Sequence, residues 1–222
     1  IMNSCNYYFA EMGYRMGMDT LRKYYADFGL GSPTGIEIGD AAGRLPSQNE
    51  GENLAPWAAF GQANQLYTPL QLANYIATLS GGGDRYTTHL LKNVRESGTG
   101  ALEYVYDAEP VQTIAMSEEN LSAVLAGMHD LATDGAVSSY FKDCIVDAAA
   151  KTGTVQTGDT KNNNGAFVCF APYDDPQIAV AIVIEKGGTG AALASTAVQV
   201  LNAYFSNAAA NTTVTGENTL LG

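Results

Sequence analysis

The chain has few of the residues on which several common kinds of site depend. Its three cysteines and two histidines lack the spacing of metal ligands, so the sequence shows neither a zinc site nor a disulfide framework. Eleven basic against 23 acidic residues give a formal net charge of -12, which argues against a nucleic acid or an anionic membrane surface as a partner. The apolar run at 178–184 is too short to cross a bilayer as a helix. We therefore expect no metal ion, no cofactor and a ligand that local groups recognise.

Apolar residues are plentiful enough for one domain. The 222 residues are 46% hydrophobic and 15% charged, which is typical of a globular chain with a sizeable core. Apolar spacing over 6–29 predicts two short helices, the second of them capped by Asp19. Thr68 before Pro69, and Ser117 before another apolar stretch, predict the starts of two further helices.

The last third changes from helical to strand periodicity. The runs at 166–171 and 177–185 are rich in strand-forming residues, and the segment "PYDDP" between them is a strong hairpin signal. We also expect a strand that ends at Lys151 and a closing helix over 190–207. The sequence thus predicts an α+β fold, in which helices flank an antiparallel sheet beside a helical subdomain.

A short polar group follows the small apolar run "AAA" at 148–150. Lys151, Thr152, Gly153 and Thr154 offer an ammonium group, two hydroxyl donors and a position without a side chain. Such a set suits a peptide carboxylate that lies along a strand edge. An ordinary exposed strand end is the alternative, because Lys-Thr-Gly arises often by chance.

Five stretches along the chain form a longer pattern than this motif alone. They are "SCNYYF" at 4–9, "FGLGSPTGIEI" at 28–38, "GRLPS" at 43–47, "FGQANQLYTPLQLANYIATLSGGG" at 60–83 and "AKTGT" at 150–154. In this order they resemble the transpeptidase domain of high-molecular-weight penicillin-binding proteins, and more the monofunctional enzymes of elongation or division than the bifunctional ones. The resemblance implies D,D-transpeptidation through a serine acyl-enzyme, with D-alanyl-D-alanine stem peptides of peptidoglycan as substrates and β-lactams as ligands.

The resemblance assigns roles to Ser4 and Asn6, which match the S-x-N element of that family. In the family, this element faces the K-T-G strand across the active-site cleft. Ser4 would relay protons between the catalytic lysine and the leaving or attacking amine, and Asn6 would hydrogen-bond the main-chain amide of the substrate. Both residues are also good helix N-caps, so a capped helix start is the alternative.

The same resemblance assigns roles to the polar strand motif. Lys151 would supply positive potential, and Thr152 and Thr154 would bind the terminal carboxylate of the substrate. The main-chain N–H of Thr154 would form half of an oxyanion hole, and Gly153 would keep the strand edge open. Ser4 and Lys151 are thus the candidate catalytic residues, and the remaining members of the two motifs are the candidate substrate-binding residues.

A few polar residues outside the motifs are given plainer roles. Gln62, Asn64 and Gln65 could line the cleft wall, but we interpret them as residues that tie down a loop before the Thr68 helix. His129 on a helical face is interpreted as packed or solvated, not as catalytic.

In this family, acyl transfer requires the serine and the lysine of an S-x-x-K element, which lies several dozen residues before S-x-N. The sequence holds one S-x-x-K, from Ser139 to Lys142, but it follows S-x-N and closely precedes Lys151. Because order along the chain is fixed within one family, we interpret "SYFK" as a solvent-facing loop with Phe141 packed beneath it. The resemblance therefore implies a C-terminal portion of the domain that lacks the nucleophile and is inactive alone.

This interpretation has consequences for organisation and partners. We divide the chain into a partial domain over 1–207, with helices and loops over 1–144, strands and closing helix over 145–207, and a disordered tail over 208–222. In the family the last strand lies beside the first, so we expect the edge of 177–185 to be covered by a second copy, another chain or a swapped segment. The resemblance also implies the missing N-terminal part and other cell-wall synthesis proteins as partners, and a place on the outer face of the cytoplasmic membrane, anchored by a segment outside this chain.

Other functions use similar short motifs. A penicillin-recognising sensor or binding module without turnover is the main alternative, and a purely structural piece is a third. The long stretches at 28–38 and 60–83 favour the transpeptidase, and nothing resembles the deacylating glutamate loop of a β-lactamase.

Overall fold

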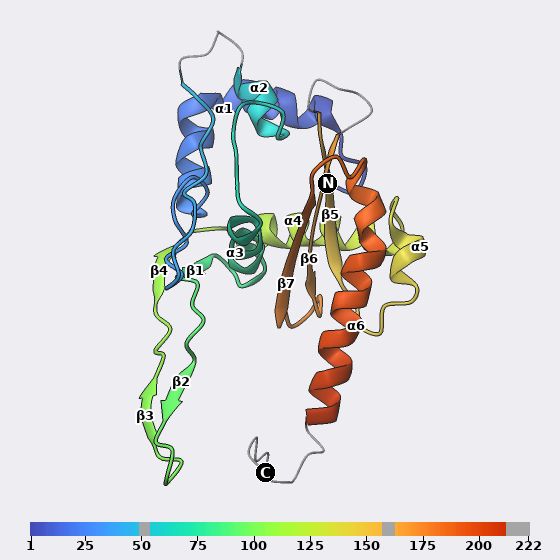
Figure 1. Ribbon diagram of the computed structural model, residues 1–222. Helices are drawn as coiled ribbons and strands as arrows, with labels where there is room; N and C mark the ends of the chain where they lie inside the picture. The colour runs from blue at the N-terminus through green and yellow to red at the C-terminus, as the bar shows by residue number, and fades with distance from the viewer. Residues whose placement is uncertain (49–53, 157–162, 212–222) are drawn as a thin grey trace.

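The computed structural model describes residues 1–48, 54–156 and 163–211 of the chain (Figure 1). A three-stranded antiparallel sheet is formed, in this order, by β5 (Ala149–Val155), β6 (Asn164–Ala171) and β7 (Ile178–Ile184). The predicted antiparallel pairing and the hairpin between the last two strands are confirmed. Helices and this sheet together make the α+β fold that the sequence predicts.

The first strand is longer than expected, because it does not end at Lys151. Pairing with β6 continues from Lys151 opposite Val168 to Val155 opposite Asn164. Threonine and valine suit an extended backbone, and the partner strand gives them a continuous ladder. The expected strand end was therefore wrong, and the polar motif lies inside the strand.

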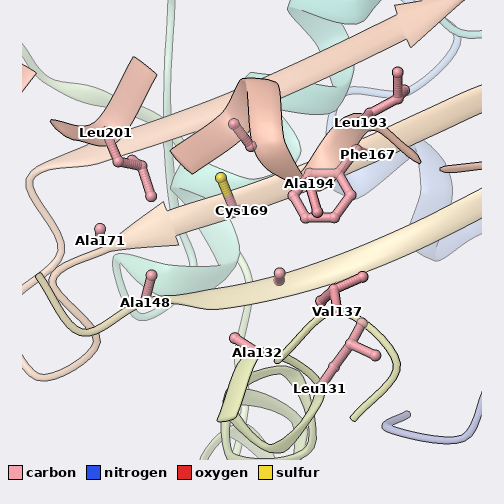
Figure 2. Close-up of a cluster of buried hydrophobic side chains, with 12 residues drawn as sticks. Leu131, Ala132, Val137, Ala148, Phe167, Cys169, Ala171, Leu193, Ala194 and Leu201 are labelled. Carbon is pink, nitrogen blue, oxygen red and sulfur yellow. The ribbon is translucent and has the colours of Figure 1, made fainter. Parts of the chain in front are cut away.

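Helices cover both faces of the sheet. The covering elements are α3 (Pro69–Ser80), α4 (Glu118–Thr133), η1 (Gly190–Leu193) and α6 (Ala194–Asn211). Side-chain alternation directs Ala150 and Phe167 toward η1 and α6, and directs Ala149 and Phe170 toward α3 and α4. Figure 2 shows the first of these two clusters, to which the C-terminal end of α4 also contributes. Two buried layers thus hold the start of β5 in place.

The closing helix is confirmed, but its end differs from the expected boundary. α6 continues to Asn211, so the segment after residue 207 begins as helix. The rest of the tail that we expected to be disordered, 212–222, lies outside the described residues.

Two helix starts follow the local signals closely. The Thr68 hydroxyl accepts a hydrogen bond from the Gln71 main chain, and the Gln71 side chain accepts one from the Thr68 N–H, which completes a capping box. The Ser117 hydroxyl accepts from the Asn120 N–H at the start of α4. Both caps are satisfied within one turn of chain, so sequence alone was enough to predict them.

The N-terminal helical region is two segments, as predicted, but they join at another residue. α1 (Asn6–Asp27) is interrupted at Gly17, whose φ of 77° and ψ of 164° are not helical. Asp19 lies inside the second segment and is not its cap, and its carboxylate instead accepts a hydrogen bond from Gln48. The break falls at a glycine because a positive φ strains any residue that has a Cβ. In Figure 1 the first segment crosses above the sheet and the second descends on the left.

The remaining elements are short. They are α2 (Leu54–Ala59), α5 (Ser138–Phe141), and the paired strands β1 (Asp84–Tyr86) with β4 (Pro110–Thr113) and β2 (Asn93–Arg95) with β3 (Leu102–Val105). The four strands form a narrow arm that extends away from the sheet (Figure 1). In the part of the chain that the structure covers, no helix combines the length and apolar character needed to cross a bilayer.

Candidate functional site

A cleft of about 480 Å³ lies between the start of α1, the end of α2 and strand β5. Its lining includes all six residues predicted for the site, together with an aromatic pair and a glutamine. The lining residues are Ser4, Asn6, Phe9, Ala59, Phe60, Gln62, Lys151, Thr152, Gly153 and Thr154. The fold thus brings the two sequence motifs, far apart along the chain, to opposite walls of one space.

A direct hydrogen bond joins these two walls. Lys151 Nζ donates to Ser4 Oγ at 2.6 Å and to the main-chain oxygen of Thr152 at 2.9 Å. Partial burial disfavours the charged form of the amine and so lowers the pKa of Lys151 from its ordinary value. An ammonium group in this position can orient the serine hydroxyl and exchange a proton with it.

The conformation of Ser4 answers whether it serves as a helix cap. The N-cap of α1 is Cys5, and no side chain makes a capping hydrogen bond there. Ser4 adopts a φ of 46°, and its N–H donates to the carbonyl of Ile1 at 3.1 Å in a tight turn. A positive φ is unfavourable for serine, and this turn directs its hydroxyl to Lys151 across the cleft. The alternative interpretation of Ser4 and Asn6 as N-caps was therefore wrong; Asn6 is the exposed first residue of the helix.

One edge of β5 faces the cleft. Among the strands that the structure describes, β5 pairs with β6 alone. The carbonyls of Thr152 and Thr154 bond to Lys151 and to Gln62, which lie on the opposite side from β6. Because the N–H and C=O of one strand residue point the same way, the N–H groups of these two threonines also point into the cleft. Donors along an edge are what an extended ligand or a developing oxyanion needs.

Gly190 of η1 packs closely against β5 and β6 next to this edge. The hydroxyl of Thr154 accepts a hydrogen bond from the N–H of Gly190 at 3.3 Å, which leaves its own hydrogen for a ligand. A Cβ on Gly190 would lie 2.3 Å from the Gly153 oxygen and 2.2 Å from the Ala166 oxygen. Only a glycine lets η1 approach the strand this closely. At Gly153 itself, a Cβ would meet the Ala166 side chain at 3.3 Å on the sheet face that carries Lys151.

Gln62 has a larger part in the site than the sequence indicated. Its Nε2 donates to the Thr154 carbonyl at 2.8 Å, whereas Asn64 and Gln65 do tie their loop, through the Ser47 N–H and the Ala58 carbonyl. The interpretation as loop residues fits these two and was wrong for Gln62. No local signal separates the three, because the contact joins residues 92 positions apart.

The S-x-x-K of the chain lies outside the cleft. Ser139 and Lys142 are exposed and belong to α5 and its C-terminal end, so the expected loop is a single helical turn. Phe141 packs toward Phe167, with ring centroids 6.3 Å apart, as expected from the sequence. Neither Ser139 nor Lys142 lines the space that holds Lys151.

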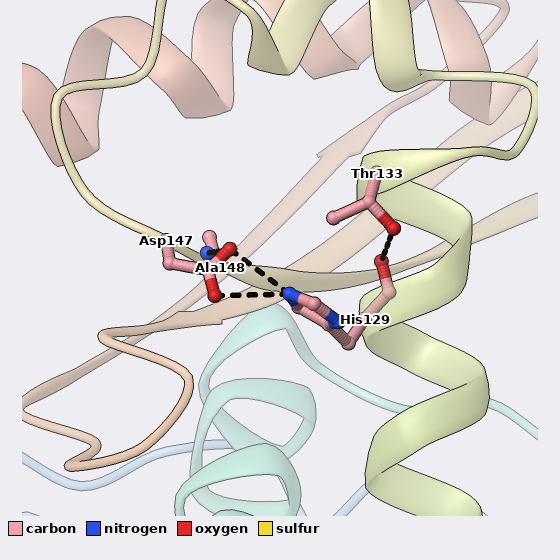
Figure 3. Close-up of polar contacts among 4 residues, drawn as sticks. All are labelled: His129, Thr133, Asp147 and Ala148. Atoms are coloured by element: carbon pink, nitrogen blue, oxygen red, sulfur yellow. Dashed lines mark hydrogen bonds and ion pairs between the residues drawn. The ribbon is translucent and has the colours of Figure 1, made fainter.

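His129 has a structural environment. Its Nε2 contacts both carboxylate oxygens of Asp147, at 2.9 and 3.0 Å (Figure 3), and its ring stacks on Tyr173 at 4.2 Å. The Tyr173 N–H donates to the Asp147 carbonyl. These contacts tie α4 to Asp147, two residues before β5, and to the β6–β7 hairpin, apart from the cleft. In the described ranges, no three His, Cys, Asp or Glu side chains gather as a metal site would require.

A second, apolar cavity of about 480 Å³ lies between α1, α2 and α3. Gln65 and Tyr67 line it, and Gln65 Oε1 and the Tyr67 hydroxyl are buried without a hydrogen-bond partner in the described structure. Burial raises the pKa of the neighbouring Tyr25 to about 12. This cavity carries none of the predicted site residues.

An antiparallel sheet between helices, with Lys-Thr-Gly-Thr on a strand edge and Ser-x-Asn on the opposite wall, is the arrangement expected of a transpeptidase domain. The family described as the penicillin-binding protein transpeptidase domain matches residues 1–205. The chain belongs to this family.

Relatives in sequence carry matching names. Penicillin-binding protein 2A of Bacillus subtilis (strain 168) is 33% identical over 179 residues, which cover 75% of this chain and 25% of that protein. The peptidoglycan D,D-transpeptidase MrdA of Escherichia coli (strain K12) is 28% identical over 225 residues, which cover 90% of this chain and 35% of that protein. The chain thus spans well under half the length of these curated relatives.

Solved structures agree in fold. Pseudomonas aeruginosa PBP2 in complex with WCK 5153 gives a TM-score of 0.79 at 28% identity, covering 92% of this chain and 48% of that one. The imipenem acyl-enzyme complex of penicillin-binding protein A from M. tuberculosis gives 0.79 at 26% identity, covering 92% and 46%. These likenesses establish the α+β transpeptidase fold.

Proposed function

We propose that this chain is the carboxylate- and amide-binding half of a serine D,D-transpeptidase that cross-links peptidoglycan stem peptides and binds β-lactams. The observation that carries the proposal is the 2.6 Å hydrogen bond from Lys151 to Ser4, made beside the cleft-facing edge of β5. The names of the relatives support the reaction class. The alternative of a sensor without turnover uses the same geometry and is less well supported, because no relative named above is a sensor.

Each residue of the cleft has a role in this proposal. The Lys151 ammonium attracts the terminal carboxylate of a D-alanyl-D-alanine peptide, and the hydroxyls of Thr152 and Thr154 donate hydrogen bonds to it. The Thr154 N–H stabilises negative charge on the scissile carbonyl oxygen in the tetrahedral intermediate. Gly153 adds no side chain to the cleft-facing part of the strand.

Ser4 and Asn6 act on the other wall of the cleft. The hydroxyl of Ser4, held by Lys151, passes a proton to the departing D-alanine amine and later accepts one from the attacking amine. The Asn6 carboxamide hydrogen-bonds the main-chain amide of the peptide. The partly buried lysine supports this relay, because its lowered pKa makes proton exchange easier.

The acylated serine of this reaction is not among the described residues that line the cleft. We propose that it comes from an S-x-x-K element elsewhere in the parent protein, since Ser139 and Lys142 lie outside the cleft. That parent would act at the outer face of the cytoplasmic membrane, with other cell-wall synthesis proteins. The 222-residue chain would then bind the ligand without forming an acyl-enzyme.

Two measurements on the chain test this proposal. Intact-mass spectrometry after incubation with benzylpenicillin should show no covalent adduct, whereas an adduct that disappears in Ser139→Ala would overturn the assignment. Titration of the 15N-labelled chain with N-acetyl-D-alanyl-D-alanine should shift the main-chain amide signals of residues 151–154. Lys151→Met should abolish these shifts, and Lys142→Met, which removes an exposed cation outside the cleft, should leave them intact. Equal losses in both variants would mean that net charge, not the site, binds the dipeptide.

A further inference from the structure

The carboxamide of Gln62 binds the cleft-facing edge of β5 at two points. Its Nε2 donates to the Thr154 carbonyl at 2.8 Å, and its Oε1 accepts from the Gln156 N–H at 3.4 Å. The carbonyl of one strand residue and the N–H two residues later are the two groups that a neighbouring strand would use. The side chain therefore takes the place of a paired strand at the end of β5, while the Thr154 N–H stays directed at the cleft.

The turn that follows α2 fixes the position of the Gln62 backbone. After α2, the Gly61 N–H donates to the Ala58 carbonyl at 3.0 Å and the Gln62 N–H donates to the Trp57 carbonyl at 2.9 Å. Gly61 has a φ of 84°. Two nested hydrogen bonds around a left-handed glycine form a Schellman motif, which ends a helix at a defined angle. The Gln62 backbone is thereby held, and only the side-chain torsions remain to be set by β5.

Burial and position distinguish this contact from an incidental surface bond. Gln62 is partly buried and lines the cleft together with Lys151 and Thr154. An edge strand without a neighbour is free to fray, and β5 has no other partner on this side in the described structure. A frayed edge would misplace the one N–H that the proposed oxyanion hole takes from this strand.

We propose that Gln62 is a positioning residue of this site, which acts by clamping the main chain of β5 at Thr154 and Gln156. The clamp holds the Thr154 N–H and hydroxyl at the spacing that a peptide carboxyl terminus requires. This inference rests on the proposed function for its consequence in ligand binding, but the clamp itself is a property of the free chain. Gln62 touches no reacting atom and acts through the strand.

The clamp is tested first without any ligand, by amide hydrogen exchange of the 15N-labelled chain. Gln62→Met keeps the side-chain length and removes both hydrogen bonds, so exchange at the Gln156 amide should become about three- to tenfold faster. Exchange at Val168 in the middle of β6 should not change. Gln65→Met is the matched control, because Gln65 belongs to the same loop but bonds to Ala58 instead of β5. Unchanged exchange at Gln156 in Gln62→Met would overturn the clamp.

Gln62→Glu separates the two hydrogen bonds. A carboxylate can still accept from the Gln156 N–H, but it cannot donate to the Thr154 carbonyl. Exchange at Gln156 should therefore stay close to that of the unmodified chain. If the glutamate variant exchanges as fast as the methionine variant, the acceptor contact is not what protects Gln156, and the two-point clamp is wrong.

Ligand affinity then tests the consequence. The dissociation constant of N-acetyl-D-alanyl-D-alanine should rise about three- to tenfold in Gln62→Met and remain unchanged in Gln65→Met. It should rise further in Gln62→Glu, because a second carboxylate near Thr154 repels that of the dipeptide. Equal affinity in all chains would overturn the positioning role. If the unmodified chain fails to bind the dipeptide, the proposed function fails, while the exchange experiment still decides whether the clamp exists.

Discussion

Lys151 shows, at the scale of one residue, how a position proposed to bind a ligand can oppose stability. Its amine is half-buried, and loss of hydration lowers its pKa from the ordinary lysine value of 10.5. The Ser4 hydroxyl and the Thr152 carbonyl compensate part of this loss. The charge is held where a ligand carboxylate would meet it, at a cost to the fold in the absence of that ligand.

The pH dependence of stability should reveal this cost. The folded pKa of Lys151 lies below the unfolded value, so the unfolded chain binds this proton more tightly and the protonated amine destabilises the fold. Below the folded pKa, Lys151→Met should be at least as stable as the unmodified chain toward urea. The advantage should shrink as the pH rises through the folded pKa toward 10.5. Other groups titrate in both chains, so the difference between the two isolates Lys151. A variant that is less stable at neutral pH would show that the hydrogen bonds outweigh the burial of charge.

At the scale of elements, the starts and ends of the helices are set by short local motifs. Capping at Thr68 and Ser117 is complete within a few residues, and the sequence predicts it correctly. The break in α1 at Gly17 and the closure of α2 at Gly61 also use local chemistry. Glycines are common in this chain, however, and their φ values are set by the path that the chain must take, so the sequence did not single these two out.

The end of α2 offers a clean test of one such glycine. At Gly61, a Cβ would meet no atom within 4 Å, yet the φ of 84° is left-handed. Gly61→Ala should therefore destabilise the chain by about 1 kcal/mol through backbone strain alone. Gly98→Ala is the matched control, because that position has equally open surroundings without a left-handed φ, and it should be neutral or slightly stabilising. Urea denaturation of both variants measures the contrast, and equal stabilities would mean that α2 can end without the Schellman geometry.

At the scale of the whole molecule, β7 forms an edge of the sheet in the part of the chain that the structure describes. Among the described strands β7 pairs with β6 alone, and Val183 and Ile184 on it are 37% and 44% exposed. An apolar edge strand readily accepts another strand. We keep the prediction from the sequence that this edge is covered, by a second copy, by another chain or by a swapped segment.

Association of the isolated chain checks this prediction. Sedimentation velocity over a range of concentrations should show self-association, and Val183→Lys should weaken it, because a lysine at the edge opposes strand pairing. Val94→Lys is the matched control, since Val94 on β2 is 38% exposed but lies in the arm. A monomer at every concentration would refute coverage by a second copy or by a swapped segment and leave another chain as the remaining cover. Equal weakening by both lysines would point to the arm or to charge in general.

The sequence by itself determined the α+β class, the antiparallel hairpin, two capped helices and the two polar motifs, because each of these depends on contacts within a short stretch or on a recognisable pattern. The family resemblance, confirmed by the match over residues 1–205, came from the order of five stretches that include those two motifs. Only the tertiary structure decided that β5 continues past Lys151, that Ser4 bonds Lys151 across 147 positions, and that Gln62 grips the strand edge across 92. Contacts between distant residues depend on how the helices pack on the sheet. Gln62, and not the similar side chains of Asn64 and Gln65, contacts β5 because the folded chain places the strand edge beside it.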